Sequence, residues 1–134
     1  MNYHIPRIML AAPASGGGKT TVTCGLLQAL LNCGVSPAAF KCGPDYIDPM
    51  FHKYVLGVDG GNLDSFFLGE HEIRRQLVLG SRRQDMAVIE GVMGYFDGVA
   101  GTSTWASSYD IARITETPVI LIVDCKGSSL SAAA

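Results

Sequence analysis

Short apolar runs alternate along the chain with longer segments of helical periodicity. The apolar runs predict buried strands at 7–12, 35–42, 86–90 and 119–124. The helical pattern predicts helices at 18–32, 50–56, 70–79 and 103–115, followed by a helix-like run at 128–134. Two glycine-rich segments, 57–62 and 91–102, are interpreted as loops, and the pattern leaves 65–68 open between strand and turn.

The alternation of strands and helices predicts an α/β fold in which a parallel sheet is flanked by helices. The segment 119–124 is uniformly apolar, so we expect this strand to be covered on both faces. Ligands of such sheets bind at the carboxyl ends of the strands. Polar residues at those ends are therefore the first candidates for a functional site.

The segment IMLAAPASGGGKTT, residues 8–21, carries the strongest local signal. A strand, a glycine-rich loop, Lys-Thr and a helix follow one another there, which predicts a phosphate-binding loop and a P-loop NTPase-like fold. Glycines let backbone N–H groups turn toward an anion, and the helix N-terminus adds its positive dipole end. Lys19 is expected to reach the outer phosphates, and Thr20 to ligate Mg²⁺. The predicted phosphate-binding residues are Gly16, Gly17, Gly18, Lys19, Thr20 and Thr21.

The match to the pattern G-x-x-x-x-G-K-[ST] is incomplete, because Pro13 occupies the first glycine position. The alternative is an ordinary glycine-rich turn that precedes a helix. The position of GGGKTT between a strand and a helix favours a variant phosphate-binding loop over that alternative.

Carboxylates follow the ends of two further predicted strands. Glu90 ends the strand 86–90, where phosphate-loop proteins carry an acid that binds Mg²⁺, and a capping role is the alternative. Asp45 and Asp48 belong to the segment GPDYIDP. Their spacing of three fits Mg²⁺ binding and the capping of turns equally well.

Other chemically active side chains carry weaker signals. Asp64 is explained by turn chemistry as well as by substrate contact, and Asp97 has the position of a substrate or metal contact. His52 is interpreted as a packed or capping residue outside the site. Trp105 and Tyr109 are four apart on the predicted helix and face either a substrate cavity or the core.

Composition limits the class of protein and its partners. Hydrophobic residues make up 48% of the 134 residues and the net charge is −2, which indicates one globular domain without a nucleic-acid patch. The longest apolar runs are too short to span a bilayer, so no membrane partner is expected. The four cysteines lack metal-ligand spacing, and scattered thiols fit a reducing cytoplasm.

Four segments in order resemble the amino-terminal half of the cobyrinic acid a,c-diamide synthases: FKCGPDYIDP, NLDSF, VIEGVMGYFDG and PVILIVDCKGSSLSAAA. The resemblance covers essentially the whole chain and lies within a wider phosphate-loop group that includes dethiobiotin synthetase. It implies a ligase of cobalamin biosynthesis. In that family ATP activates the a and c carboxylates of cobyrinate as acyl phosphates, and ammonia derived from glutamine displaces the phosphate.

The resemblance also implies roles for individual residues. Asp45 and Glu90 would bind Mg²⁺ together with Thr20. The residues implied at the reaction centre are Lys41, Asp48, Asp64 and Asp97. Lys41 would neutralise charge during phosphoryl transfer, with Asp48 nearby. The acids at 64 and 97 would face the corrin or the acyl phosphate.

The chain departs from the family pattern in two ways. Ala12-Pro13 stands where relatives carry Gly-Thr, and no cysteine lies in a stretch that resembles the glutaminase nucleophile. We therefore expect residues 1–134 to be a truncated amino-terminal part of the ATP-binding domain, without the glutamine amidotransferase domain. Such a part would bind ATP weakly, be poorly stable and be unable to use glutamine by itself.

Two other interpretations are kept open. One is a nucleotide-switch ATPase that acts as a homodimer and binds protein partners. Such ATPases carry a signature lysine five residues before Lys19, where this chain has Ala14, and this counts against them. The other is an inactive truncation product.

Overall fold

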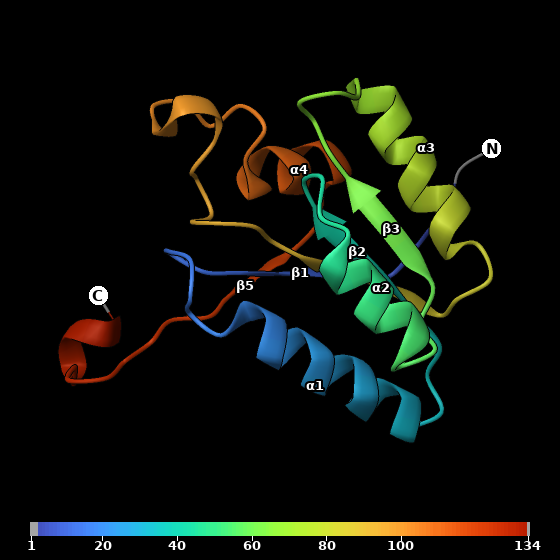
Figure 1. The fold of residues 1–134 in the computed structure, drawn as a ribbon, viewed down its shortest axis with the longest axis horizontal. Coiled ribbons are helices and arrows are strands. Elements are labelled where there is room, and N and C mark those ends of the chain that lie inside the picture. Colours follow the sequence, from blue (N-terminus) through green and yellow to red (C-terminus); the bar gives the residue numbers. More distant parts are fainter. Residues whose placement is uncertain (1–2, 134) are drawn as a thin grey trace.

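The computed structural model describes residues 3–133 and contains one parallel five-stranded sheet (Figure 1). The strands are β1 (Arg7–Ala11), β2 (Pro37–Cys42), β3 (Gly60–Leu63), β4 (Met86–Glu90) and β5 (Val119–Leu121). They lie in the order β3-β2-β4-β1-β5, and all their pairings are parallel. The predicted α/β fold with a parallel sheet flanked by helices is confirmed.

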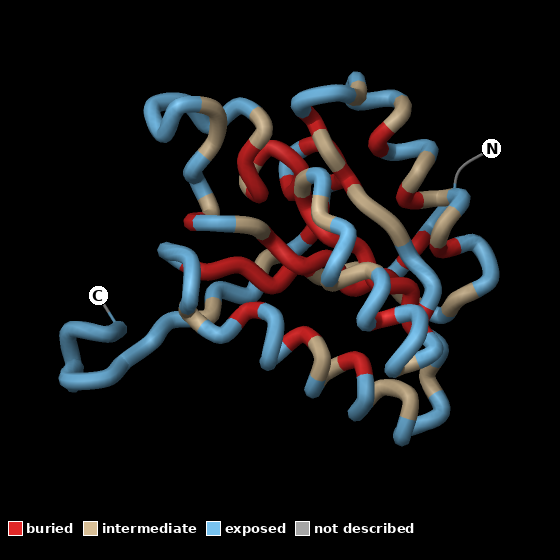
Figure 2. The backbone as a smooth tube through the Cα atoms, in the orientation of Figure 1, coloured by how far each residue is buried: buried red, intermediate tan, exposed pale blue. Residues whose placement is uncertain are grey.

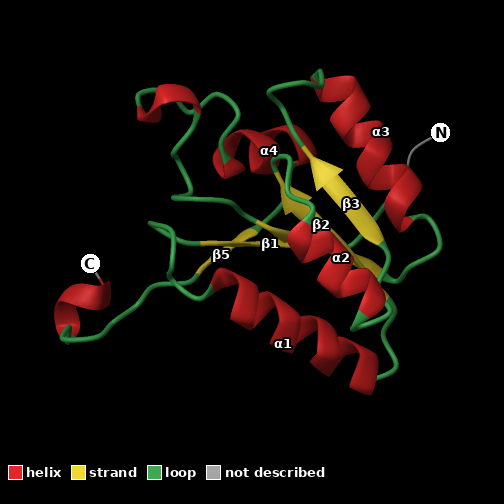
Figure 3. Ribbon diagram, viewed as in Figure 1, coloured by secondary structure: helices red, strands yellow, loops and turns green. Residues whose placement is uncertain are grey.

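Helices connect the strands and cover both faces of the sheet (Figure 3). The helices are α1 (Lys19–Asn32), α2 (Ile47–Tyr54), α3 (Glu70–Ser81) and α4 (Ser108–Thr115), with 3₁₀ turns at Val99–Gly101 and Leu130–Ala133. None of the helices described is long and apolar enough to cross a membrane.

Adjacent residues of the central strands serve opposite faces, because side chains alternate along a strand. Leu10 packs in one buried cluster with Leu27 of α1, whereas Met9 packs in the other with Ile73 of α3 and Ile111 of α4. The strands β1, β2 and β4 are consequently buried throughout most of their length (Figure 2). These buried strands carry residues of the candidate site at their carboxyl ends.

The prediction of a loop over 57–62 is wrong in its second half, because β3 begins at Gly60 and pairs with β2. A Cβ at position 60 would collide with the carbonyl oxygen of Ala39, so a glycine allows the two backbones to approach. A four-residue edge strand that begins Gly-Gly-Asn has no apolar alternation that would identify it in the sequence. Residues 65–68 form a turn rather than a strand.

The predicted helix 103–115 begins only at Ser108. The side chain of Ser107 caps it by accepting a hydrogen bond from the Asp110 backbone N–H at 3.1 Å. Trp105 therefore precedes the helix and does not share a helical face with Tyr109. The two aromatic residues lie in different clusters, since Trp105 contacts Phe66 and Tyr109 contacts Tyr95.

The prediction that 119–124 is covered on both faces is also wrong. The strand β5 is an edge strand of three residues that pairs only with β1 in the described part of the chain. Ile120 and Leu121 are about half exposed, at 51% and 50%. A uniformly apolar run indicates a buried strand only where elements pack on both of its faces.

Candidate functional site

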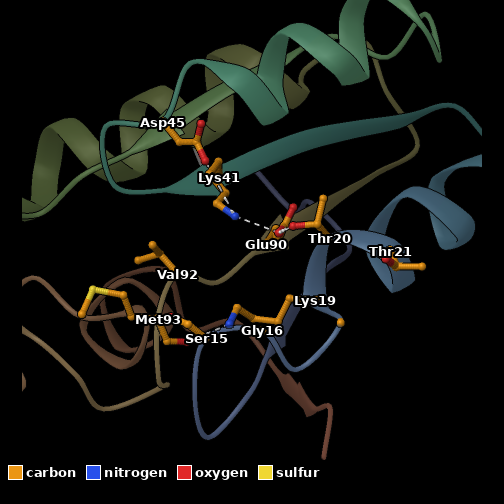
Figure 4. A pocket seen from close by; sticks show the side chains of 11 residues that line it. Ser15, Gly16, Lys19, Thr20, Thr21, Lys41, Asp45, Glu90, Val92 and Met93 are labelled. Atoms are coloured by element: carbon orange, nitrogen blue, oxygen red, sulfur yellow. Dashed lines mark hydrogen bonds and ion pairs between the residues drawn. The ribbon is translucent and has the colours of Figure 1, made fainter. Parts of the chain in front are cut away.

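A cavity of about 450 Å³ opens at the carboxyl ends of β1, β2 and β4 (Figure 4). The sheet register creates it, because Glu90 at the end of β4 pairs with Leu10 on one side and Lys41 on the other. The lining residues are Ser15, Gly16, Gly18, Lys19, Thr20, Thr21, Lys41, Asp45, Glu90, Val92 and Met93. Most of the residues predicted from the glycine-rich motif and the strand ends therefore meet in one place.

The loop between β1 and α1 has a backbone that only glycine adopts readily at two positions. Gly16 and Gly18 have φ angles of 76° and 89°, and the helix begins directly afterwards at Lys19. Gly17 lies outside the cavity lining and faces Ala12 instead. The N-terminus of a 14-residue helix thus lies at the cavity, where its dipole favours an anion.

The Lys19 side chain is largely buried and bends back across the loop. Its ammonium donates hydrogen bonds to the carbonyl oxygens of Ala14 at 3.1 Å and Met93 at 2.8 Å. Burial and the neighbouring charge of Lys41 lower the pKa of Lys19, and the charge of Glu90 offsets part of this effect. A cation that is partly desolvated in this way gains strongly from a nearby phosphate.

Glu90 is completely buried and links the start of α1 to β2. Its Oε1 accepts hydrogen bonds from the Thr20 hydroxyl at 2.6 Å and from the Lys41 ammonium at 2.7 Å. These three side chains point toward one another in Figure 4. The Oε2 atom is buried without a hydrogen-bond partner among the described residues. A carboxylate oxygen and a hydroxyl are ligands that Mg²⁺ accepts, so the donor set fits that ion.

Lys41 lies among three carboxylates. Its ammonium is 2.8 Å from Asp48 Oδ2 and 4.0 Å from Asp45 Oδ2, in addition to its contact with Glu90. Burial lowers the pKa of Lys41, but the hydrogen bonds and charges of Asp48 and Glu90 outweigh burial, so the net pKa is raised. Lys41 therefore stays a cation at the edge of the cavity.

Asp45 has the capping role, one of the two that its spacing suggested. Its Oδ1 accepts the backbone N–H of Ile47 at 2.8 Å and so caps the turn before α2. The residue also lines the cavity, and its other oxygen, Oδ2, lies 4.0 Å from the Lys41 ammonium. Capping through one oxygen leaves the other available to a cation.

Comparison with known proteins identifies the family. Residues 8–118 match the profile described as the CobQ/CobB/MinD/ParA nucleotide binding domain. The chain belongs to this family. This membership agrees with the parallel sheet, the glycine-rich loop and the cavity at the carboxyl ends of the strands.

Named relatives of this nucleotide-binding domain come from several organisms. The chain is 47% identical to the cobyrinate a,c-diamide synthase of Thermoplasma acidophilum and 45% identical to the hydrogenobyrinate a,c-diamide synthase of Streptomyces coelicolor, each over 97% of the chain. It is 50% identical over 95% of its length to the cobyrinate a,c-diamide synthase of Gloeobacter violaceus. The chain spans 27–29% of the length of these relatives.

Two supporting residues of the nucleotide-binding domain are not predicted by the sequence motifs. The Asn62 side-chain amide donates to the carbonyl oxygens of Gly43 and Asp45, both at 2.7 Å, and so holds the loop after β2. Met93 has a φ angle of 52° and presents its carbonyl oxygen to Lys19. Neither residue type signals a site by itself. The glycines on both sides of Val92-Met93 were the only hint of a tight backbone.

The two acids predicted to face the corrin or the acyl phosphate, Asp64 and Asp97, have different positions. Asp64 lines a second cavity beside the first, and its Oδ1 accepts the Phe66 N–H at 2.9 Å. Asp97 is exposed, accepts the Gly94 N–H at 3.1 Å through Oδ2 and lines neither cavity. The structure thus brings Asp64 toward the site and leaves Asp97 in a turn of the loop above it.

His52 is buried on α2, with both ring nitrogens lacking hydrogen-bond partners among residues 3–133. Burial lowers its pKa more than the charges of Glu90 and Asp48 raise it. The interpretation of His52 as a packed residue agrees with this environment.

Proposed function

We propose that this nucleotide-binding domain binds ATP with Mg²⁺ and contributes to an ATP-dependent ligase that amidates the a and c carboxylates of cobyrinate. The observation that carries the ATP and Mg²⁺ assignment is Glu90, which is held by Thr20 and Lys41 through one oxygen and keeps the other free. The acceptor is proposed from the activity after which the related synthases are named.

The proposed nucleotide site uses the loop before α1. The loop Gly16-Gly17-Gly18 and the start of α1, Lys19-Thr20-Thr21, would hold the phosphates through backbone N–H groups and the Lys19 ammonium. Thr20, Asp45 and Glu90 would hold Mg²⁺, which when bound neutralises charge on the phosphates. The buried, unpartnered Glu90 Oε2 supports this assignment, because a cation would satisfy it.

In the proposed reaction a carboxylate oxygen of cobyrinate forms a bond to the γ-phosphorus of ATP, and the bond from that phosphorus to the ADP oxygen breaks. The nitrogen of ammonia then bonds to the acyl carbon and loses a proton. The carbon–oxygen bond to the phosphate breaks, which leaves an amide and inorganic phosphate. Lys41 would stabilise the charge of the transferring group, since three carboxylates keep it protonated.

Asp48 is proposed to orient Lys41 through their 2.8 Å contact. We assign Asp64 and Asp97 to the acceptor side, and the position of Asp64 in the second cavity supports its share of this assignment. Glutamine is proposed as the source of ammonia, and no residue of this chain is assigned to glutamine hydrolysis. The four described thiols are free, which is consistent with a cytoplasmic reaction.

The test supplies residues 1–134 with millimolar ATP, Mg²⁺ and ammonium chloride, with and without cobyrinate. We expect ADP release that depends on cobyrinate, together with a corrinoid product whose mass matches an amide. Glutamine in place of ammonium chloride should give no product. ATP turnover at the same rate with and without cobyrinate would overturn the proposed ligase function and favour the nucleotide-switch ATPase.

A further inference from the structure

A second cavity, of about 660 Å³, adjoins the phosphate cavity. The two cavities share Asp45, Val92 and Met93 in their linings, so a molecule in one can reach a group bound in the other. The second cavity lies between the loop after β2 and the turn after β3, and Asp64 lines it.

Large apolar side chains gather around this second cavity although they are exposed to solvent. They are Tyr46, Ile47, Phe66, Phe67 and Met93, and each is 49–79% exposed. Phe66 and Phe67 pack edge to face with ring centroids 4.8 Å apart, and Trp105 lies against Phe66 at 5.3 Å. A concave site with an apolar wall and few polar groups is typical of a small-molecule site.

Charge distinguishes the two ends of the joined cavities. Asp64 lines the second cavity, and its buried Oδ2 has no hydrogen-bond partner in the described chain, so the charge of this carboxylate disfavours a second carboxylate at the apolar end. The lining of the second cavity has acidic side chains and no basic one, whereas Lys19 and Lys41 balance Asp45 and Glu90 in the first cavity, which is therefore the less repulsive end for a carboxylate. A ligand with a broad apolar body and carboxylate arms would therefore place its body in the second cavity and direct an arm into the first.

We propose that the second cavity holds the ring of the acceptor, with Phe66 and Phe67 against its apolar face. The inference rests on the proposed function, which supplies an acceptor of this chemistry. It assigns Phe66 and Phe67 as residues that determine acceptor specificity without contacting the nucleotide. An arm that passes Met93 brings its carboxylate to the phosphate cavity.

The test measures cobyrinate binding through the fluorescence of Trp105, the single tryptophan of the chain, which lies beside Phe66. Phe66→Ala and Phe67→Ala should each raise the Kd for cobyrinate about tenfold or more, which corresponds to roughly 1.4 kcal/mol of lost contact. Phe66→Tyr should keep the wild-type Kd. The Kd for ATP, measured by calorimetry, should stay unchanged in all three variants.

Phe51→Ala is the matched control. Phe51 is 43% exposed on α2, close to the 49% of Phe66, but lines neither cavity. Its replacement should leave both Kd values unchanged. Circular dichroism of every variant checks that the fold is retained.

The outcomes separate the inference from the proposed function. If the wild-type chain binds cobyrinate and Phe66→Ala and Phe67→Ala bind it equally well, the location of the ring is wrong while the function stands. If the wild-type chain binds ATP but not cobyrinate, both fail. A change in oligomeric state on light scattering, with unchanged cobyrinate affinity, would instead assign the apolar wall to contact between copies of the chain.

Discussion

The Lys41 ammonium lies 2.7 Å from Glu90 Oε1, and both side chains are almost completely removed from solvent. Adjacent strands in register place them together, since Lys41 of β2 pairs with Glu90 of β4. The same carboxylate oxygen also accepts the Thr20 hydroxyl. The Glu90 oxygen thus connects β2 and β4 to the start of α1, so its contacts affect the stability of the fold as well as the chemistry of the site.

Lys41→Met should destabilise the chain by about 3 kcal/mol, because it leaves Glu90 buried and uncompensated. The double variant Lys41→Met/Glu90→Gln should recover part of this loss. Urea unfolding measures both. Lys53→Met is the control, since Lys53 is exposed and 3.9 Å from Asp59, and it should cost less than about 1 kcal/mol. Equal effects at positions 41 and 53 would contradict the importance of burial.

Lys19→Ala should weaken ATP binding about tenfold or more. The reason is that a charge-assisted hydrogen bond to phosphate contributes on the order of 1.5–3 kcal/mol. Calorimetric titration with ATP measures the change, and Lys126→Ala, at an exposed residue beyond β5, serves as the control. Unchanged ATP affinity and turnover in Lys19→Ala would remove Lys19 from the phosphate site.

Glu90→Gln should raise the Mg²⁺ concentration needed for ATP binding, because an amide is a weaker ligand for Mg²⁺ than a carboxylate. The amide oxygen still accepts the hydrogen bonds from Thr20 and Lys41, so the fold should remain. The measurement is a Mg²⁺ titration of ATP binding, with Glu72→Gln on α3, at a residue that lines neither cavity, as the control. The metal assignment fails if the midpoint is the same for Glu90→Gln and the wild type.

His52 should make the folded chain less stable as the pH drops below 6.5, the ordinary pKa of histidine. Because burial lowers the pKa of folded His52, the unfolded chain binds more protons in the window between the two pKa values. The free energy of unfolding should therefore decrease with falling pH by up to about 1.4 kcal/mol per unit in that window.

Urea unfolding at pH 7.5 and 5.5 tests this dependence. His52→Leu should show a smaller loss of stability at pH 5.5 than the wild type does. His71→Leu, at an exposed position on α3, controls for the removal of an imidazole. Identical pH dependence in His52→Leu and the wild type would exclude His52 as the source.

Gly60→Ala should destabilise the chain by about 1–3 kcal/mol, because its Cβ would collide with the Ala39 carbonyl oxygen of the neighbouring strand. Gly61→Ala is a sharp control, since a Cβ there has open space around it. Urea unfolding compares the two. A similar small effect at both positions would show that the β2–β3 approach is not tight.

The sequence by itself determined the features that depend on neighbours along the chain. The order of strand, glycine-rich loop, Lys-Thr and helix is local, so residues 8–21 were sufficient to predict a phosphate-binding loop, and the helix beginning at Lys19 agrees. The position of Glu90 at the end of a strand was also predictable, because the four apolar residues 86–89 directly precede it. In the structure the last four residues of β4 are buried. The α/β fold followed from the alternation of such segments.

Only the tertiary structure decided what depends on partners far apart in the sequence. Whether 119–124 is buried depends on what packs against β5, and its apolar composition contains no information about that. The strand β3 exists because β2 offers an edge and Gly60 allows close approach. Lys41 meets Glu90 and Asp48 because strand register and the position of α2 converge there, and no spacing along the chain encodes that convergence.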